Sequence, residues 1–126
     1  MALNLTEEWD KLQTGVENPS TLVTGVVIAR REFVEQNPEA VSAFMDHYAE
    51  SVAFVNGNVE EAADLVEHYG VVKAPIARKA IPACNIVFIE GAEMQTKLSG
   101  YLQVLFDQNP KSVGGALPGD DFYFAR

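Results

Sequence analysis

The feature that most constrains the fold is residues 22–29, LVTGVVIA, an almost continuous run of apolar, mostly β-branched side chains. Polar and apolar residues do not alternate in it, which favours a strand buried on both faces over one with a wet face. Such a strand needs neighbours along both edges, because its backbone N–H and C=O groups must be hydrogen-bonded. The chain offers one other short strand-like run, IVFI at residues 86–89.

A sheet of only two strands is marginal in water. The sequence therefore predicts an α/β fold that is mainly helical, with one or two strands and a sheet that is incomplete in the isolated chain. Residues 1–126 are expected to form a single partial domain. We expect it to belong to a larger α/β unit, or to be a homo-oligomer that buries residues 22–29 or the apolar helix face that begins at Val41.

Helical periodicity and capping residues account for most of the remaining chain. Asn4, Asn37 and Asn58 stand at predicted N-cap positions, where a side-chain oxygen accepts hydrogen bonds from the first free N–H groups. The helices are expected over residues 4–14, 37–56, 58–69, 74–80 and 93–107. The second of these carries an apolar face committed to a core, made of Val41, Phe44, Met45, Tyr48, Ala49 and Val52. From residue 109 onward a loop is predicted, with Gly114 and Gly115 as turn residues.

The charge excludes some classes of partner. Nine basic and eighteen acidic residues give a formal net charge of −9, which argues against nucleic acid or an anionic membrane surface. No apolar run reaches the roughly 20 residues that span a bilayer. The first residues, MALNLTEEWDK, carry neither the basic nor the apolar region of a signal peptide.

Candidate chemical groups are few and isolated. His47 is expected on an exposed helix face, and His68 near a helix C-terminus, where a cation complements the dipole. Cys84 has no histidine near it in sequence and is expected to be a small buried hydrophobe. The paired Asp120 and Asp121 are expected in a solvated tail. We therefore predict no catalytic residues, no metal site and no cofactor.

Several segments together resemble a known family. TGVVIARREF at residues 24–33, followed by EQNPEAV at 35–41, is similar to the strand-then-helix segment of bacterial ABC-transporter substrate-binding proteins of the nitrate/sulfonate/taurine class. Their fold is of the type II periplasmic-binding-protein kind. Further similar segments are NVEEAA at 58–63, AIP and CNIVFI within 80–89, NPKSVGG at 109–115 and DDFY at 120–123. Their order and spacing extend the resemblance over essentially the whole chain.

The resemblance implies a two-lobed receptor that holds a small solute between its lobes and delivers it to an ABC permease. The solute is expected to be a molecule such as nitrate, a sulfonate, taurine or a thiamine pyrimidine precursor. This chain is similar only to the C-terminal part, so the N-terminal lobe and its signal peptide are expected outside it. The full-length protein is expected outside the cytoplasm, in the periplasm or as a cell-surface lipoprotein.

The candidate ligand-binding residues lie where the chain enters residues 22–29. Thr21 and Thr24 offer hydroxyl groups, and Gly25 allows a ligand or another backbone to approach closely. The alternative reading is ordinary strand propensity for the threonines and a bulge at Gly25.

Two other functions stay open. One is an enzyme of the same fold, similar to the pyrimidine-precursor synthases. The other is a self-associating helical module without a small ligand.

Overall fold

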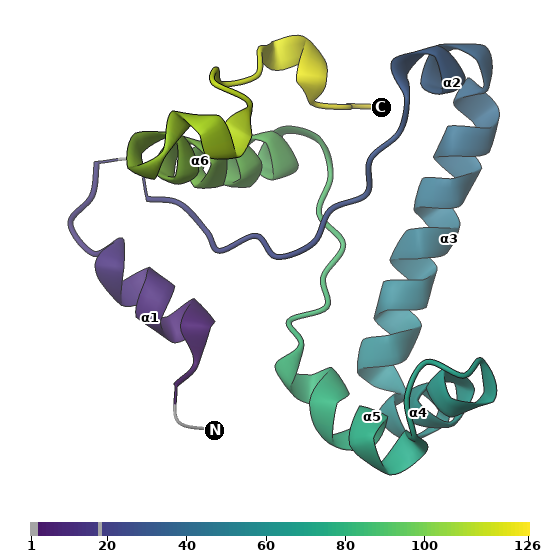
Figure 1. Ribbon diagram of the computed structural model, residues 1–126. Coiled ribbons are helices and arrows are strands. Elements are labelled where there is room, and N and C mark those ends of the chain that lie inside the picture. The colour runs from purple at the N-terminus through teal and green to yellow at the C-terminus, as the bar shows by residue number, and fades with distance from the viewer. Residues whose placement is uncertain (1–2, 18) are drawn as a thin grey trace. The chain divides into compact units, whose positions relative to one another are not determined.

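The computed structural model describes residues 3–17 and 19–126, and their regular structure is helical throughout (Figure 1). The helices, with η marking 3₁₀ turns, are α1 Leu5–Leu12, α2 Arg31–Gln36, α3 Pro38–Gly57, α4 Val59–His68, α5 Ala74–Ala80, η1 Ile81–Ala83, α6 Gly91–Gln108, η2 Pro110–Val113 and η3 Asp120–Phe122. None of the described helices is both long and apolar enough to cross a membrane.

The α/β prediction is wrong, because residues 3–17 and 19–126 contain no strand. Residues 22–29 and 86–89 both lie in open chain without a β-ladder (Figure 1). Their composition favours an extended backbone, but a strand also requires a second backbone in register to accept and donate its hydrogen bonds. In the described chain neither segment has that partner. A helix that the sequence did not predict, α2, begins immediately after the first segment.

The chain divides into two compact units. Unit 1 comprises Met1–Ile28 together with Ile89–Arg126, and unit 2 comprises Ala29–Phe88. Unit 2 is thus inserted into unit 1, and the chain passes from one unit to the other twice. These passages fall at the ends of the two segments that were predicted to be strands.

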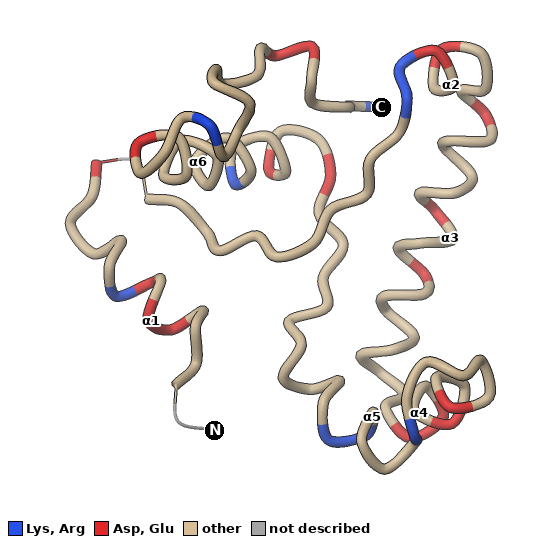
Figure 2. Tube along the Cα trace, viewed as in Figure 1, with Lys and Arg blue, Asp and Glu red and all other residues tan. Residues whose placement is uncertain are grey.

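Unit 2 has a core made mainly of small side chains. The buried residues that form its cluster are Ala62, Ala63, Ala74, Ala77 and Ile81. They come from α4, α5 and η1, and alanines at such a contact allow two helix backbones to approach closely. Charged pairs join the same two helices, since Arg78 on α5 contacts Glu60 and Asp64 on α4. Figure 2 shows the acidic positions of α4 and the basic positions of α5 along the chain.

Only the C-terminal end of the predicted apolar face of α3 is buried. Val52 is 8% exposed, whereas Phe44 is 50% exposed. Phe44 and Tyr48 stack on each other with ring centroids 5.8 Å apart, and the Tyr48 ring meets the edge of Phe88 at 5.7 Å. The expectation that the whole face packs into a core is therefore wrong for its N-terminal half, where Phe44 and Tyr48 stay exposed.

The predicted helix caps form at one of three positions. The Asn4 side chain accepts from the backbone N–H groups of Thr6 and Glu7, which confirms the cap of α1. Asn37 and Asn58 make no such bond to α3 and α4. Their amide groups instead donate to carbonyl oxygens four residues earlier, at 3.0 and 3.1 Å. Both asparagines therefore close the preceding helix rather than open the next one.

The N-terminus of α5 is capped from a distance by Glu67 of α4. One carboxylate oxygen accepts from the Lys73 ammonium and the other from the Ala74 backbone N–H, each at 2.8 Å. The Lys73 hydrogen bond, followed by the Ala74 hydrogen bond, lowers the pKa of Glu67 from its ordinary value of 4.5. The same contact raises the pKa of Lys73 above 10.5.

Glu67→Gln is expected to lower the stability of unit 2 in a pH-dependent way. A carboxylate whose folded pKa is depressed contributes stability that is present above the unfolded pKa and is lost as pH falls through the folded one. The difference in unfolding free energy between parent and variant should therefore hold above pH 4.5 and shrink below it. Denaturant unfolding across this range measures the difference. Glu50→Gln on α3 is the control, and a difference that grows on acidification would contradict the assignment.

The exposed apolar segment before α2 predicts self-association of the isolated chain. Three consecutive apolar residues are exposed here: Val26 and Val27 are each 58% exposed, and Ile28 is 84% exposed. Contiguous exposed apolar surface of this kind is typical of an interface. Sedimentation at micromolar concentration should show a dimer or larger species that Ile28→Thr weakens, while Ile76→Thr on α5 does not. A monodisperse parent monomer would contradict this prediction.

Candidate functional site

Ser20 is the buried polar residue around which this part of unit 1 is organised, with 6% of its surface exposed. Its backbone N–H and its hydroxyl both donate to the Gln13 side-chain oxygen, at 2.8 and 3.0 Å. The Trp9 indole N–H lies 3.1 Å from the Ser20 hydroxyl oxygen and 3.3 Å from its carbonyl oxygen. The chain entering residues 22–29 is therefore tied to α1.

The same residue is packed against α6. A methyl group added at Gly100 would lie 3.2 Å from the Cβ atom of Ser20, so a side chain at this position would crowd Ser20. The Trp9 ring is 5.4 Å from the ring of Tyr101, the next residue on α6. Together these contacts fix Pro19 and Thr21, the neighbours of Ser20, beside the N-terminal half of α6.

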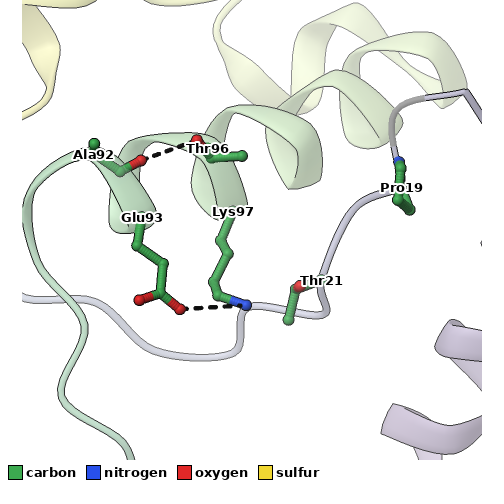
Figure 3. A pocket seen from close by; sticks show the side chains of 6 residues that line it. All are labelled: Pro19, Thr21, Ala92, Glu93, Thr96 and Lys97. Carbon is green, nitrogen blue, oxygen red and sulfur yellow. Dashed lines mark hydrogen bonds and ion pairs between the residues drawn. The ribbon is translucent and has the colours of Figure 1, made fainter.

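An open hollow of about 390 Å³ lies at this junction (Figure 3). We call it the polar hollow, and its lining residues are Pro19, Thr21, Ala92, Glu93, Thr96 and Lys97. The first two come from the loop held by Ser20, and the other four from the first two turns of α6. All six belong to unit 1.

The polar hollow contains one acid and one base. The Glu93 carboxylate and the Lys97 ammonium lie 3.7 Å apart, at the i and i+4 positions of α6 (Figure 3). The Thr96 hydroxyl donates to the carbonyl oxygen of Ala92 at 2.9 Å. The Thr21 hydroxyl makes no hydrogen bond to any other residue that the structure describes. The lining therefore presents charges of both signs and a free hydroxyl.

The three residues proposed from the sequence do not lie together. Thr21 lines the polar hollow, whereas Thr24 and Gly25 are exposed further along the open chain and are not among its lining residues. Among the described residues, no group closely approaches Gly25, because a Cβ built there meets nothing within 4 Å. Sequence reasoning missed Glu93, Thr96 and Lys97, whose only sequence signal is the Glu-to-Lys spacing of an ordinary helix surface pair.

A second hollow, of about 650 Å³, lies elsewhere in unit 1. It is lined by residues that follow α1, by the second half of α6 and by the segment from Leu117 to Tyr123. Its charged lining residues are Glu17 and Asp107, both acidic. This hollow lacks the mixed charge that distinguishes the polar hollow.

The tail after α6 packs back onto that helix. The Ser112 hydroxyl hydrogen-bonds to the carbonyl oxygens of Leu105 and Asn109, and Gly114 and Gly115 both have positive φ, which confirms their prediction as turn residues. The Arg126 guanidinium makes two hydrogen bonds to the Glu90 carboxylate, at 2.9 and 3.2 Å. These contacts anchor the start of α6, on which the polar hollow depends.

The isolated histidines and the cysteine lie outside the polar hollow. His47 is exposed on α3, and His68 lies in the last turn of α4, as predicted. Cys84 is exposed, so the expectation of a buried position is wrong. It directly follows η1. In the ranges that the structure covers, no three potential ligand side chains cluster to hold a metal ion.

Comparison with known protein families, curated proteins and solved structures gave no significant match for this chain.

Ser20→Ala is expected to lower the stability of unit 1 by about 1–3 kcal/mol, because it removes a buried hydroxyl and leaves the half-buried polar groups of Trp9 and Gln13 with fewer partners. Chemical denaturation followed by Trp9 fluorescence reports on this unit directly, since the chain has a single tryptophan. Ser51→Ala, at an exposed position of α3, is the matched control and should change stability little. An unchanged unfolding midpoint for Ser20→Ala would show that the loop is held by other contacts.

Proposed function

We propose that this chain is the C-terminal part of a solute-binding receptor of an ABC importer, and that it contributes one wall of the solute site. The observation that carries the proposal is the polar hollow, an open depression whose lining includes polar residues, among them Thr21, which was proposed from the sequence. Small-molecule sites are usually concave and carry a few placed polar groups. The resemblance of TGVVIARREF at residues 24–33 and EQNPEAV at 35–41 to the substrate-binding proteins of ABC importers supports the proposal.

Two further features agree with the proposal. The polar hollow of unit 1 is open to solvent. An open hollow is expected if another part of the receptor supplies the opposite side of the solute site. The loop of unit 1 also carries the exposed apolar residues Val26, Val27 and Ile28. An apolar segment without a β-ladder is suited to pairing with a further part of the receptor. In this proposal the full-length receptor acts outside the cytoplasm and delivers its solute to a permease.

One wall is expected to bind a solute only weakly. A receptor that closes around its solute obtains much of its affinity from contacts on both sides. An open hollow leaves the polar groups of the ligand partly hydrated. The isolated chain should therefore bind nitrate, alkanesulfonates, taurine and pyrimidine precursors too weakly for calorimetry to detect.

Calorimetry on two proteins tests the proposal: this chain, and the same chain extended by the residues that its gene encodes upstream. The extended protein is expected to bind one small solute, and Thr21→Val should weaken that binding more than Thr24→Val does. Failure of the extended protein to bind any solute would contradict the proposal. Submicromolar binding by the short chain would instead indicate a self-contained binding module.

A further inference from the structure

The second hollow of unit 1, which we call the acidic hollow, offers exposed apolar surface beside negative charge. Its apolar lining residues are Val16, Val104, Leu117 and Pro118. Val16 is 46% exposed and Leu117 is 39% exposed, so both keep apolar surface in contact with water. An occupant with apolar side chains of its own would remove that surface from water, which is favourable.

The charged residues that line the acidic hollow have one sign. They are Glu17 and Asp107, both exposed, and neither forms an ion pair with a described residue. Burial raises the pKa of the lining residue Tyr123, and the nearby charge of Asp120 raises it further. Negative charge therefore surrounds the apolar surface of this hollow, which favours an occupant that carries positive charge.

The chain itself carries a segment of the complementary character. Val26, Val27 and Ile28 are exposed one after another, and the exposed Arg30 follows them two residues later. Arg30 forms no ion pair with any other residue that the structure describes. We call residues 26–30 the basic apolar segment. It combines uncovered apolar side chains with an unpaired cation within five residues.

Two copies of the chain satisfy both surfaces together. The apolar side chains of the segment would cover Val16 and Leu117 of the other copy, while the Arg30 guanidinium would meet the Glu17 and Asp107 carboxylates. Pairing like with like, hollow on hollow or segment on segment, lacks this attraction between opposite charges. Charge complementarity therefore selects the contact between unlike surfaces.

We infer that the acidic hollow is an interface for a second copy of this chain, occupied by the basic apolar segment of that copy. Two copies that exchange these contacts form a closed dimer in which the same contact is made twice. The inference locates the surface that receives the exposed segment when the isolated chain self-associates. It does not depend on the proposed function, because no solute takes part in the contact.

Two double variants of the full chain separate the two sides of this interface. The hollow variant, Glu17→Lys with Asp107→Lys, alters only the acidic hollow, and the segment variant, Ile28→Thr with Arg30→Gln, alters only the segment. In sedimentation each variant by itself should dissociate roughly tenfold more readily than the parent. A mixture of the two should associate more strongly than either alone, because one copy keeps an intact hollow and the other an intact segment.

The matched control reverses two acidic residues elsewhere. Glu39→Lys with Glu50→Lys, at exposed positions of α3, changes the net charge by the same amount as the hollow variant. Because the chain has a net charge of −9, general repulsion between copies falls in both proteins. The control should therefore associate at least as tightly as the parent, whereas the hollow variant should associate more weakly. Trp9 fluorescence checks that unit 1 is folded in each variant, and the milder Asp107→Asn should act in the same direction as the hollow variant.

Three results would overturn the inference. If the hollow variant associates as the parent does, the segments pair with each other and the hollow takes no part. If the mixture associates no better than its two components, the hollow and the segment do not meet. A parent that stays monomeric would also contradict the interface. The proposed function fails in a different measurement, the calorimetry of the extended protein.

Discussion

The buried hydrogen bonds of Ser20 are the constraint on which unit 1 depends. Gln13 and Trp9 on one side and Gly100 on the other hold a single residue of the loop between α1 and α6. Leaving such groups without partners in a buried position is costly, so the loop has little freedom at this point. Because Thr21 is the next residue, the shape of the polar hollow depends on a contact made by a residue that does not line it.

The two units are stabilised in different ways. In unit 2, small apolar residues such as Ala63 and Ala77 allow α4 and α5 to pack closely, and Glu67 caps the second helix from the first. In unit 1, the described residues that are buried are not large apolar side chains, and the arrangement rests on polar contacts such as those of Ser20 and Arg126. Unit 1 is therefore expected to be the more sensitive of the two to substitutions of hydrogen-bonding groups.

The polar hollow illustrates how a site arises from residues that are ordinary in sequence. Glu93 and Lys97 form a common helix surface pair, and such pairs usually do no more than support the helix. Their position beside the loop that carries Thr21 gives them a different significance, since an acid, a base and an unpaired hydroxyl then face one open space. No sequence motif joins residues 21 and 93.

The sequence by itself determined the local structure. The helices over most of the predicted ranges, the Asn4 cap and the turns at Gly114 and Gly115 follow from contacts between residues close in the chain, whose energetics local patterns report directly. Tertiary structure decided the rest. Residues 22–29 have the composition of a strand but no partner in the described chain, Asn37 and Asn58 close helices instead of opening them, and Cys84 is exposed. Strand pairing, burial and the meeting of Thr21 with α6 each require a second segment distant in sequence, and a local pattern does not say where that segment lies.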